Sequence, residues 1–160
     1  MKFNFNINQL DNNQRNVFHD ACAFGTKETV EFLIQNAKKY NIDLNLRDNL
    51  GYTPFHLACY YGKLQIAETL LENSKQYKIN VVSLNAGKDG QALAEQEGYT
   101  DVVNLIKDWK RKDAVEPFDQ MLTKLKGLEK FGLSEEQKKL LDDVTELIKA
   151  KKQLEKEAIK

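Results

Sequence analysis

Apolar residues in the first two thirds of the chain recur in short groups with helical spacing, separated by turn-forming residues. One group follows Thr53-Pro54 and stops at Gly62. Threonine can accept the first free N–H of a helix, proline suits the first helical turn, and glycine tolerates the left-handed conformation at a helix end. A longer group follows, with apolar residues on one face at positions 66, 70 and 71. The pattern therefore predicts a short helix over about 54–61, a turn, and a longer helix.

This pattern repeats with a period of 36 to 37 residues. A shift of 37 superimposes the segment 18–42 on 55–79, and a shift of 36 superimposes 57–70 on 93–106. One such unit cannot bury its apolar face alone, so a fixed period of this size predicts a stack of units. We expect units at about 11–47, 48–84 and 85–112.

The first ten residues read as the tail end of a further unit, because the segment 3–12 aligns with 40–49. Two interpretations remain open for this partial unit at 3–10. It is either an N-terminal cap of the stack or a remnant of a longer array. The third unit is degenerate, since it has Asp89 as a helix cap but lacks the histidine of the other two.

The repeat register ends after Trp109, and 113–160 reads as a separate helical segment. We expect a new helix to start at Glu116-Pro117, Gly132 to end it, and Ser134-Glu-Glu-Gln137 to open a last helix as a capping box. Leucines recur every seven residues in that last helix, at 133, 140, 147 and 154. Two interpretations stand: a helical hairpin that caps the stack, or a coiled-coil segment that forms a homodimer or binds a partner through 134–160.

The composition narrows the classes of function. The formal net charge is +0 and the pI is about 6.7, without the basic stripe that nucleic-acid binding usually needs. No apolar run reaches the roughly 20 residues of a membrane span, and the N-terminus lacks the apolar core of a signal peptide. With two cysteines and no targeting segment, we expect an intracellular protein of the cytoplasm or nucleus, with no nucleic-acid or membrane partner.

Two His-x-x-Cys pairs, His19/Cys22 and His56/Cys59, raise the question of a metal or thiol site. A structural zinc site needs four converging ligands, whereas these pairs lie at equivalent places in two repeats. The repeat explains both pairs, so we expect no metal and no disulfide. Motifs for phosphate binding, for a nucleophile elbow or for a zinc protease are also missing from the sequence. We therefore expect no enzymatic activity and no cofactor.

The stretch GYTPFHLACYYGKLQIAETLL at 51–71 resembles an ankyrin repeat, whose hallmark is Gly-x-Thr-Pro-Leu-His-x-Ala. Phe55 stands in the usual leucine position. Ankyrin repeats usually have about 33 residues, so the resemblance implies that the 36 to 37 residues here include an extension of roughly one helical turn near 38–41 and 75–78. The resemblance implies an all-α ankyrin-repeat helical solenoid with short finger loops, followed by the C-terminal helical segment. It also implies that a set of residues maintains the repeat: His19, Gly25, Thr53, Pro54, His56, Gly62, Asp89 and Gly98.

Ankyrin repeats imply a non-catalytic module that binds a protein partner through its turns and its concave helix face. The matching positions here are Phe24, Asn49, Leu50, Tyr52, Tyr60, Tyr61, Lys88, Gln96 and Glu97. Four of them, Phe24, Tyr52, Tyr60 and Tyr61, we call the aromatic strip. Their rings either bind the partner or pack on a neighbouring repeat. Two other functions stay open: assembly by self-association of the C-terminal helix, and a regulatory segment of a longer ankyrin-containing protein.

Asn45 is a candidate for modification. The stretch Ile42-Asp-Leu-Asn45 resembles the turn in ankyrin arrays whose asparagine is hydroxylated by oxygen-sensing enzymes. The resemblance implies an added oxygen on Asn45, which the intact mass of natively expressed protein would reveal.

Overall fold

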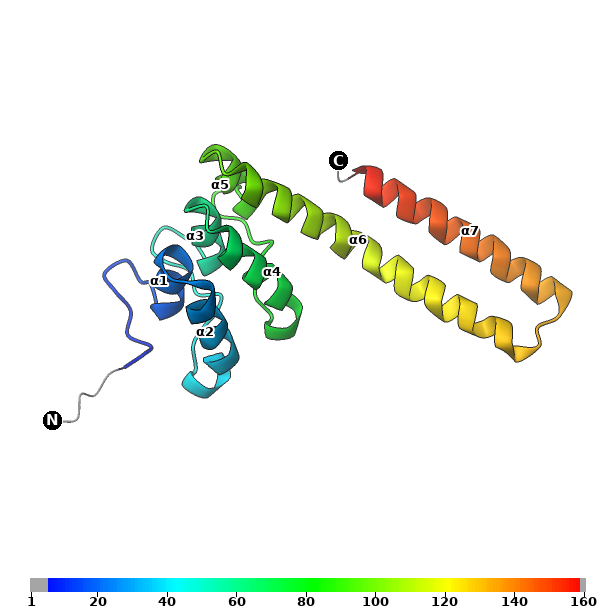
Figure 1. Ribbon diagram of the computed structural model, residues 1–160, viewed down its shortest axis with the longest axis horizontal. Coiled ribbons are helices and arrows are strands. Elements are labelled where there is room, and N and C mark those ends of the chain that lie inside the picture. The colour runs from blue at the N-terminus through cyan, green and yellow to red at the C-terminus, as the bar shows by residue number, and fades with distance from the viewer. Residues whose placement is uncertain (1–5, 159–160) are drawn as a thin grey trace. The chain divides into compact units, whose positions relative to one another are not determined.

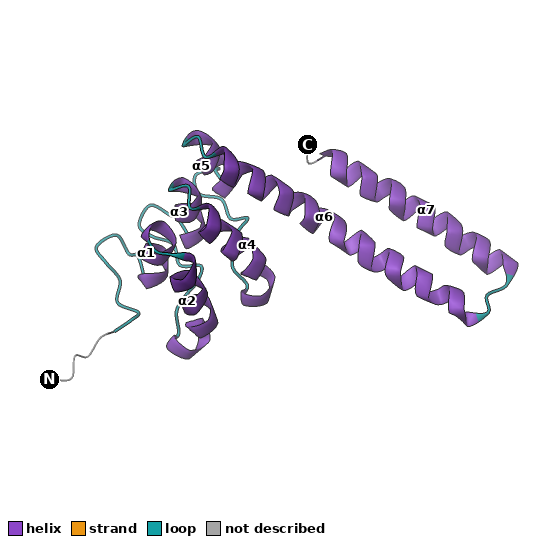
Figure 2. Ribbon diagram, in the orientation of Figure 1, coloured by secondary structure: helices purple, strands orange, loops and turns teal. Residues whose placement is uncertain are grey.

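A computed structural model describes residues 6–158, and within them the chain is built from helices without a β-strand (Figure 2). Residues 3–5 of the partial unit predicted at 3–10 lie outside the described residues. The all-α solenoid of helix pairs predicted from the sequence is confirmed. The elements are α1 (Val17–Phe24), α2 (Lys27–Tyr40), α3 (Pro54–Tyr60), α4 (Leu64–Tyr77), α5 (Gly90–Gln96), α6 (Thr100–Leu128), the 3-10 helix η1 (Glu129–Phe131) and α7 (Glu135–Ala158).

The chain divides into two compact units, and the boundary between Ile106 and Lys107 falls inside α6. In the first unit the short helices α1, α3 and α5 stand in one row, and the longer α2 and α4 stand in a second row (Figure 1). Apolar side chains from both rows fill the space between them. The most deeply buried include Phe18, Val30, Ile34, Phe55, Leu57, Leu70 and Ile106. Each such side chain contributes on the order of 1.5–3 kcal/mol, so stacking supplies most of the stability.

The short helices begin where a polar side chain caps them. Asn16 accepts a hydrogen bond from the N–H of His19, and Thr53 accepts one from His56. Asp89 accepts one from Ala92 at 2.9 Å. These bonds satisfy N–H groups that have no partner inside the helix, and they set where each unit starts.

The helix ends follow the predicted extension. Both longer helices gain a last turn and stop at a left-handed residue with φ 54°, which is Asn41 in one and Lys78 in the other. Helix α3 ends at Tyr60, one residue earlier than predicted, and Gly62 then adopts φ +61°. Gly25, its counterpart in the first unit, has φ −81° instead. A Cβ there would lie 2.6 Å from the carbonyl oxygen of Ala21, so close approach is what requires glycine.

Polar residues cover both end faces of the stack. Phe55 and Cys59 of α3 lie against Gly90 of α5, where a Cβ would come within 2.6 Å and 2.7 Å of them. At the same repeat positions α5 has Gln91 and Glu95, joined by a 2.9 Å hydrogen bond. At the other end of the stack, Asp20 of α1 is exposed. The equivalent positions in α3 and α5 are Leu57 and Leu93, which are buried. Terminal repeats with a polar outer face keep a stack from exposing apolar surface.

The second unit is a helical hairpin. The end of α6 and α7 run antiparallel, and Lys152 of α7 forms an ion pair with Asp119 of α6 (Figure 1). Gly132 turns the chain with φ +62°, and Ser134 and Gln137 exchange the two hydrogen bonds of a capping box.

The helix restart predicted at Glu116-Pro117 is wrong, because α6 runs unbroken from Thr100 to Leu128 with Pro117 inside it. Proline has no backbone N–H, so Pro117 cannot donate the i→i−4 hydrogen bond that other residues inside a helix make. Pro117 is exposed, so water can reach this part of the backbone and reduce the cost.

Candidate interaction surface

The aromatic strip is a continuous row of rings. Phe24 at the end of α1 lies 5.1 Å from Tyr61, between ring centroids. Tyr61 meets Tyr60 edge-on, at 5.1 Å and 88°, and Tyr60 lies 6.4 Å from Tyr52 on the preceding turn. Tilted and edge-on pairs at these distances are favourable for aromatic rings, because the edge of one ring faces the electron-rich surface of another. The row therefore connects two repeats without leaving the surface.

The structure shows that the rings of the strip pack on one another, and their role in binding a partner stays a prediction. Phe24 is 62% exposed although it contacts the next repeat through Tyr61, and the three tyrosines are half-buried. The rings therefore pack on one another and still present area to solvent. Because neighbouring rings restrict their torsions, a partner would find them largely ordered before binding.

The turn before α3 is held by a side chain that the sequence did not single out. Asp48 is buried, and its Oδ1 accepts hydrogen bonds from the N–H groups of Leu50 and Tyr52 at 3.0 Å and 2.9 Å. Its Oδ2 accepts a hydrogen bond from Nε of Arg15 at 3.1 Å, which makes the pair a salt bridge. Asn49 donates its N–H to the carbonyl of Asn13, so neighbouring turns are linked. Leu50, at 66% exposure, therefore projects from a fixed loop.

The sequence repeat could have identified Asp48 as a turn-forming residue. Asp11 lies 37 residues earlier and organises the first turn in the same way, accepting from the N–H groups of Asn13 and Arg15 at 2.8 Å each. The bond from Arg15 lowers the pKa of the Asp11 carboxyl. An aspartate followed directly by asparagine at the same place in two repeats marks a turn built on a carboxylate.

The predicted residues of the third unit form a polar cluster. Nζ of Lys88 hydrogen-bonds to Oε1 of Gln96, and Nε2 of Gln96 donates to Oε1 of Glu97 at 2.8 Å. All three side chains are exposed. The concave face therefore changes from aromatic in the first two repeats to polar and charged in the third.

The two histidines lie inside the repeat. His19 and His56 complete capping boxes with Asn16 and Thr53, and Nε2 of His19 reaches the carbonyl of Tyr52 at 3.2 Å. Burial lowers the pKa of both rings, so they are neutral when the protein is folded. Nε2 of His56 makes no hydrogen bond, although nearby backbone carbonyls oppose the fall of its pKa.

Burial raises the pKa of the Cys22 thiol, with Cys59 adding to the effect, and this disfavours the reactive thiolate. Both cysteines are free and buried. Over residues 6–158 the structure brings together no group of three His, Cys, Asp or Glu side chains that could hold a metal ion. The part of the chain that is described also has no helix both long and apolar enough to cross a membrane.

The side chain of Asn45 links two repeats. Its Nδ2 donates to the carbonyl of Lys78 at 2.9 Å, and its Oδ1 accepts from the N–H of Asn80 at 2.7 Å. Both ends of the amide are therefore used within the stack, and the residue is half-buried. A modifying enzyme would have to open this connection.

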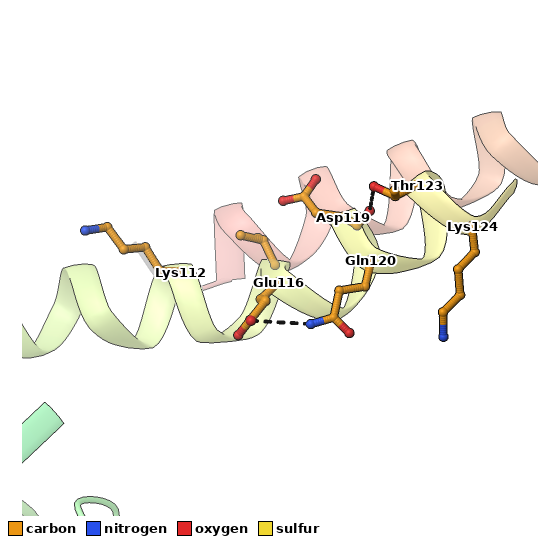
Figure 3. A pocket seen from close by; sticks show the side chains of 7 residues that line it. Lys112, Glu116, Asp119, Gln120, Thr123 and Lys124 are labelled. Carbon is orange, nitrogen blue, oxygen red and sulfur yellow. Dashed lines mark hydrogen bonds between the residues drawn. The ribbon is translucent and has the colours of Figure 1, made fainter. Parts of the chain in front are cut away.

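A shallow hollow lies along α6 in the hairpin unit (Figure 3). Its side chains bond within the helix: Gln120 donates to Glu116 at 3.3 Å, and Thr123 donates to the carbonyl of Asp119 at 2.9 Å. These groups are exposed and lie along one helix face, so the hollow does not have the convergent polar groups of a ligand site.

Comparison with known families agrees with this geometry. A family model described as ankyrin repeats, in three copies, matches residues 1–83, which is more than half of the chain. The chain belongs to the ankyrin-repeat family. The matched residues include the whole aromatic strip and the Asp48 turn, whereas α5 and α6 lie beyond them. A search of curated proteins found no match. Ankyrin repeats typically bind proteins and are typically non-catalytic.

Proposed function

We propose that this ankyrin protein is a protein-interaction module that holds its partner with the aromatic strip and the adjoining turns. The observation that supports this most is the row of four partly exposed rings, which starts with Tyr52 on the turn fixed by Asp48 and continues over the ends of α3 and α1. The stack does not need these rings in its core, which is complete without them. Tyrosine gives a large contact area with few torsions to immobilise, and it is enriched among residues that dominate binding energy.

The proposed surface extends beyond the strip on both sides. Leu50 and Asn49 project from the turn, and the polar cluster of Lys88, Gln96 and Glu97 continues the face in the third repeat. A partner that fits would place apolar or aromatic groups on the strip and hydrogen-bonding groups on the cluster. An interface core of aromatic residues with a polar rim is the usual arrangement of a stable complex.

The test is a quantitative pull-down with the full chain as bait. Wild type is compared with Tyr60→Ala/Tyr61→Ala, and Phe32→Ala is the matched control because Phe32 is a 53% exposed aromatic residue on α2, outside the strip. Affinity for the captured protein is then measured with purified material. We expect the double variant to lose roughly 10- to 100-fold in affinity, as for two hot-spot residues, and the control to bind like wild type.

Thermal melts of the three proteins show whether each bait is folded. Equal affinity of a folded double variant and wild type would contradict the proposal, because recognition would then not use the strip. An equal loss in the Phe32 control would also contradict it, since the effect would not depend on the position of the aromatic ring.

A further inference from the structure

The hairpin unit has no buried core of its own. None of residues 107–158 is buried, although they form most of one long helix and the whole of another. Helices in proteins owe most of their stability to the packing of an apolar face rather than to intrinsic propensity. The hairpin therefore needs a further surface to cover its apolar side chains.

Helix α7 has an exposed apolar stripe. Its members lie three, four or seven residues apart on one face and are 36–70% exposed: Leu140, Val144, Leu147 and Leu154. We call this set the outer stripe. Leu141 and Ile148, one position after two of its members, are half-buried on the side of α7 that faces α6.

Helix α6 extends this apolar face. Met121 and Leu128, seven residues apart, are 48% and 45% exposed, and Met121 directly precedes the half-buried Leu122. Viewed along one axis, antiparallel helices turn in opposite senses. The residue just before an inward-facing one therefore lies on the same side of the hairpin in both helices, which puts Met121 beside the outer stripe.

The opposite side of the hairpin is polar. The residues just after the inward-facing positions are Thr123 and Lys126 in α6, and Asp142 and Lys149 in α7. By the same geometry these four lie together on the other side. The hairpin thus has one mainly apolar face, interrupted by Lys124 on α6 and Lys151 on α7, and one polar face. Each half of a helix bundle has a similar division.

We infer that the apolar face is a self-association surface, where the hairpins of two copies of this chain join into a four-helix bundle with their α7 helices antiparallel. The charge of the hairpin permits a second copy as the occupant, and the placement of Lys151 and Asp143 described below favours one. Within 107–160 there are 14 Lys or Arg and 12 Asp or Glu, so like charge does not oppose association. Two apolar hairpin faces of equal size would cover one another.

The direction follows from Lys151, the charged residue that interrupts the outer stripe. In a parallel pair, Lys151 of one copy would face Lys151 of the other, and like charges at such a position disfavour pairing. In an antiparallel pair centred between Val144 and Leu147, Lys151 lies opposite Leu140 of the second copy. It is then within one helical turn of Asp143 of that copy, so its stem covers the leucine and its charge meets a carboxylate.

The first experiment measures the solution mass of the full chain by light scattering over a range of micromolar concentrations. We expect twice the 18.4 kDa of one chain for wild type, and a single chain for Leu140→Lys/Leu147→Lys. The matched control is Leu84→Lys, which changes a leucine of the ankyrin unit that is 58% exposed and lies outside the proposed binding surface, and this variant is expected to stay dimeric. Circular dichroism melts check that each variant is folded.

A wild-type protein that stays monomeric at all concentrations would overturn the inference and leave the face to a different protein. A dimer that survives Leu140→Lys/Leu147→Lys in folded protein would overturn it as well. In that case the two copies associate elsewhere.

The second experiment tests the direction by exchanging charges. Lys151→Glu and Asp143→Lys should each raise the dimer Kd, roughly two- to thirtyfold for the two symmetry-related pairs, and the double variant should recover wild-type affinity. In a parallel pair the double variant would show no recovery. That result would overturn the antiparallel arrangement.

Discussion

Single residues carry two kinds of task in this stack. His19 and His56 each complete a capping box and are buried against the following turn, so one side chain serves the helix start and the packing between repeats. Their place in the repeat could be predicted from the sequence. Their contacts could not, because the bond from His19 to the carbonyl of Tyr52 joins residues 33 positions apart.

The lowered pKa values of His19 and His56 predict that the folded protein loses stability in mild acid. Burial lowers the pKa of both rings from an ordinary value of 6.5, so the unfolded chain takes up protons near that pH before the folded chain does. Stability is therefore complete above about pH 6.5 and falls as the pH is lowered through and below that value. Urea unfolding at a series of pH values measures this.

The control for that prediction is His19→Gln/His56→Gln. We expect this variant to be less stable than wild type near neutral pH but to lose less stability on acidification, because glutamine does not titrate. A parallel decline of the two proteins between about pH 7 and pH 5 would show that the histidines are not the cause.

Alanine substitutions at Gly62 and Gly98 separate two contributions to the free energy of unfolding. One is the strain of a left-handed backbone, and the other is a steric clash of the added Cβ. The two glycines occupy the same place in successive repeats, with φ +61° and +80°. A Cβ at Gly62 would lie 2.4 Å from the Tyr99 ring, whereas one at Gly98 would meet nothing within 4 Å. We expect Gly98→Ala to cost about 1–2 kcal/mol and Gly62→Ala about 1 kcal/mol more, by chemical denaturation. Equal costs would mean that the ring moves aside freely.

At the scale of elements, helix starts were the most predictable features. A cap is a bond between residues three apart, so Thr53, Asp89 and Ser134 signal their helices locally. The helix start predicted at Pro117 was wrong because the surrounding sequence forms one continuous helix, which overrides the local preference of proline for a first turn. The leucines of the last helix also could not be divided by sequence into those facing α6 and those facing solvent, since α7 carries both kinds side by side.

Pro117→Ala should stabilise the hairpin. Alanine supplies the backbone N–H that proline does not have and removes the steric conflict of the ring, so we expect a gain of roughly 1–3 kcal/mol. Urea unfolding followed by circular dichroism would measure it. Gln120→Ala, an exposed change three residues further along α6, should stay within about 0.5 kcal/mol of wild type. A neutral or destabilising Pro117→Ala would mean that the proline is not strained in this helix.

At the scale of the whole molecule, the repeat made the fold and the members of the aromatic strip predictable. A period of 36 to 37 residues fixes which positions share a face, and the ankyrin resemblance predicts that Phe24, Tyr52, Tyr60 and Tyr61 lie on the concave side. Whether their rings touch depends on side-chain directions that sequence spacing leaves open. The structure joins them into one row, while the Asp48 bonds fix the turn beside it.

Hydrogen–deuterium exchange of the full chain, with and without its captured partner, tests the role of the strip most directly because it needs no substitution. We predict slower exchange in the partner-bound state at 20–24, 49–53 and 57–62, the segments that carry the strip. Exchange in 107–158 should be unchanged by that partner. Protection confined to 107–158, with the ankyrin turns exchanging as in the free protein, would contradict recognition by the strip.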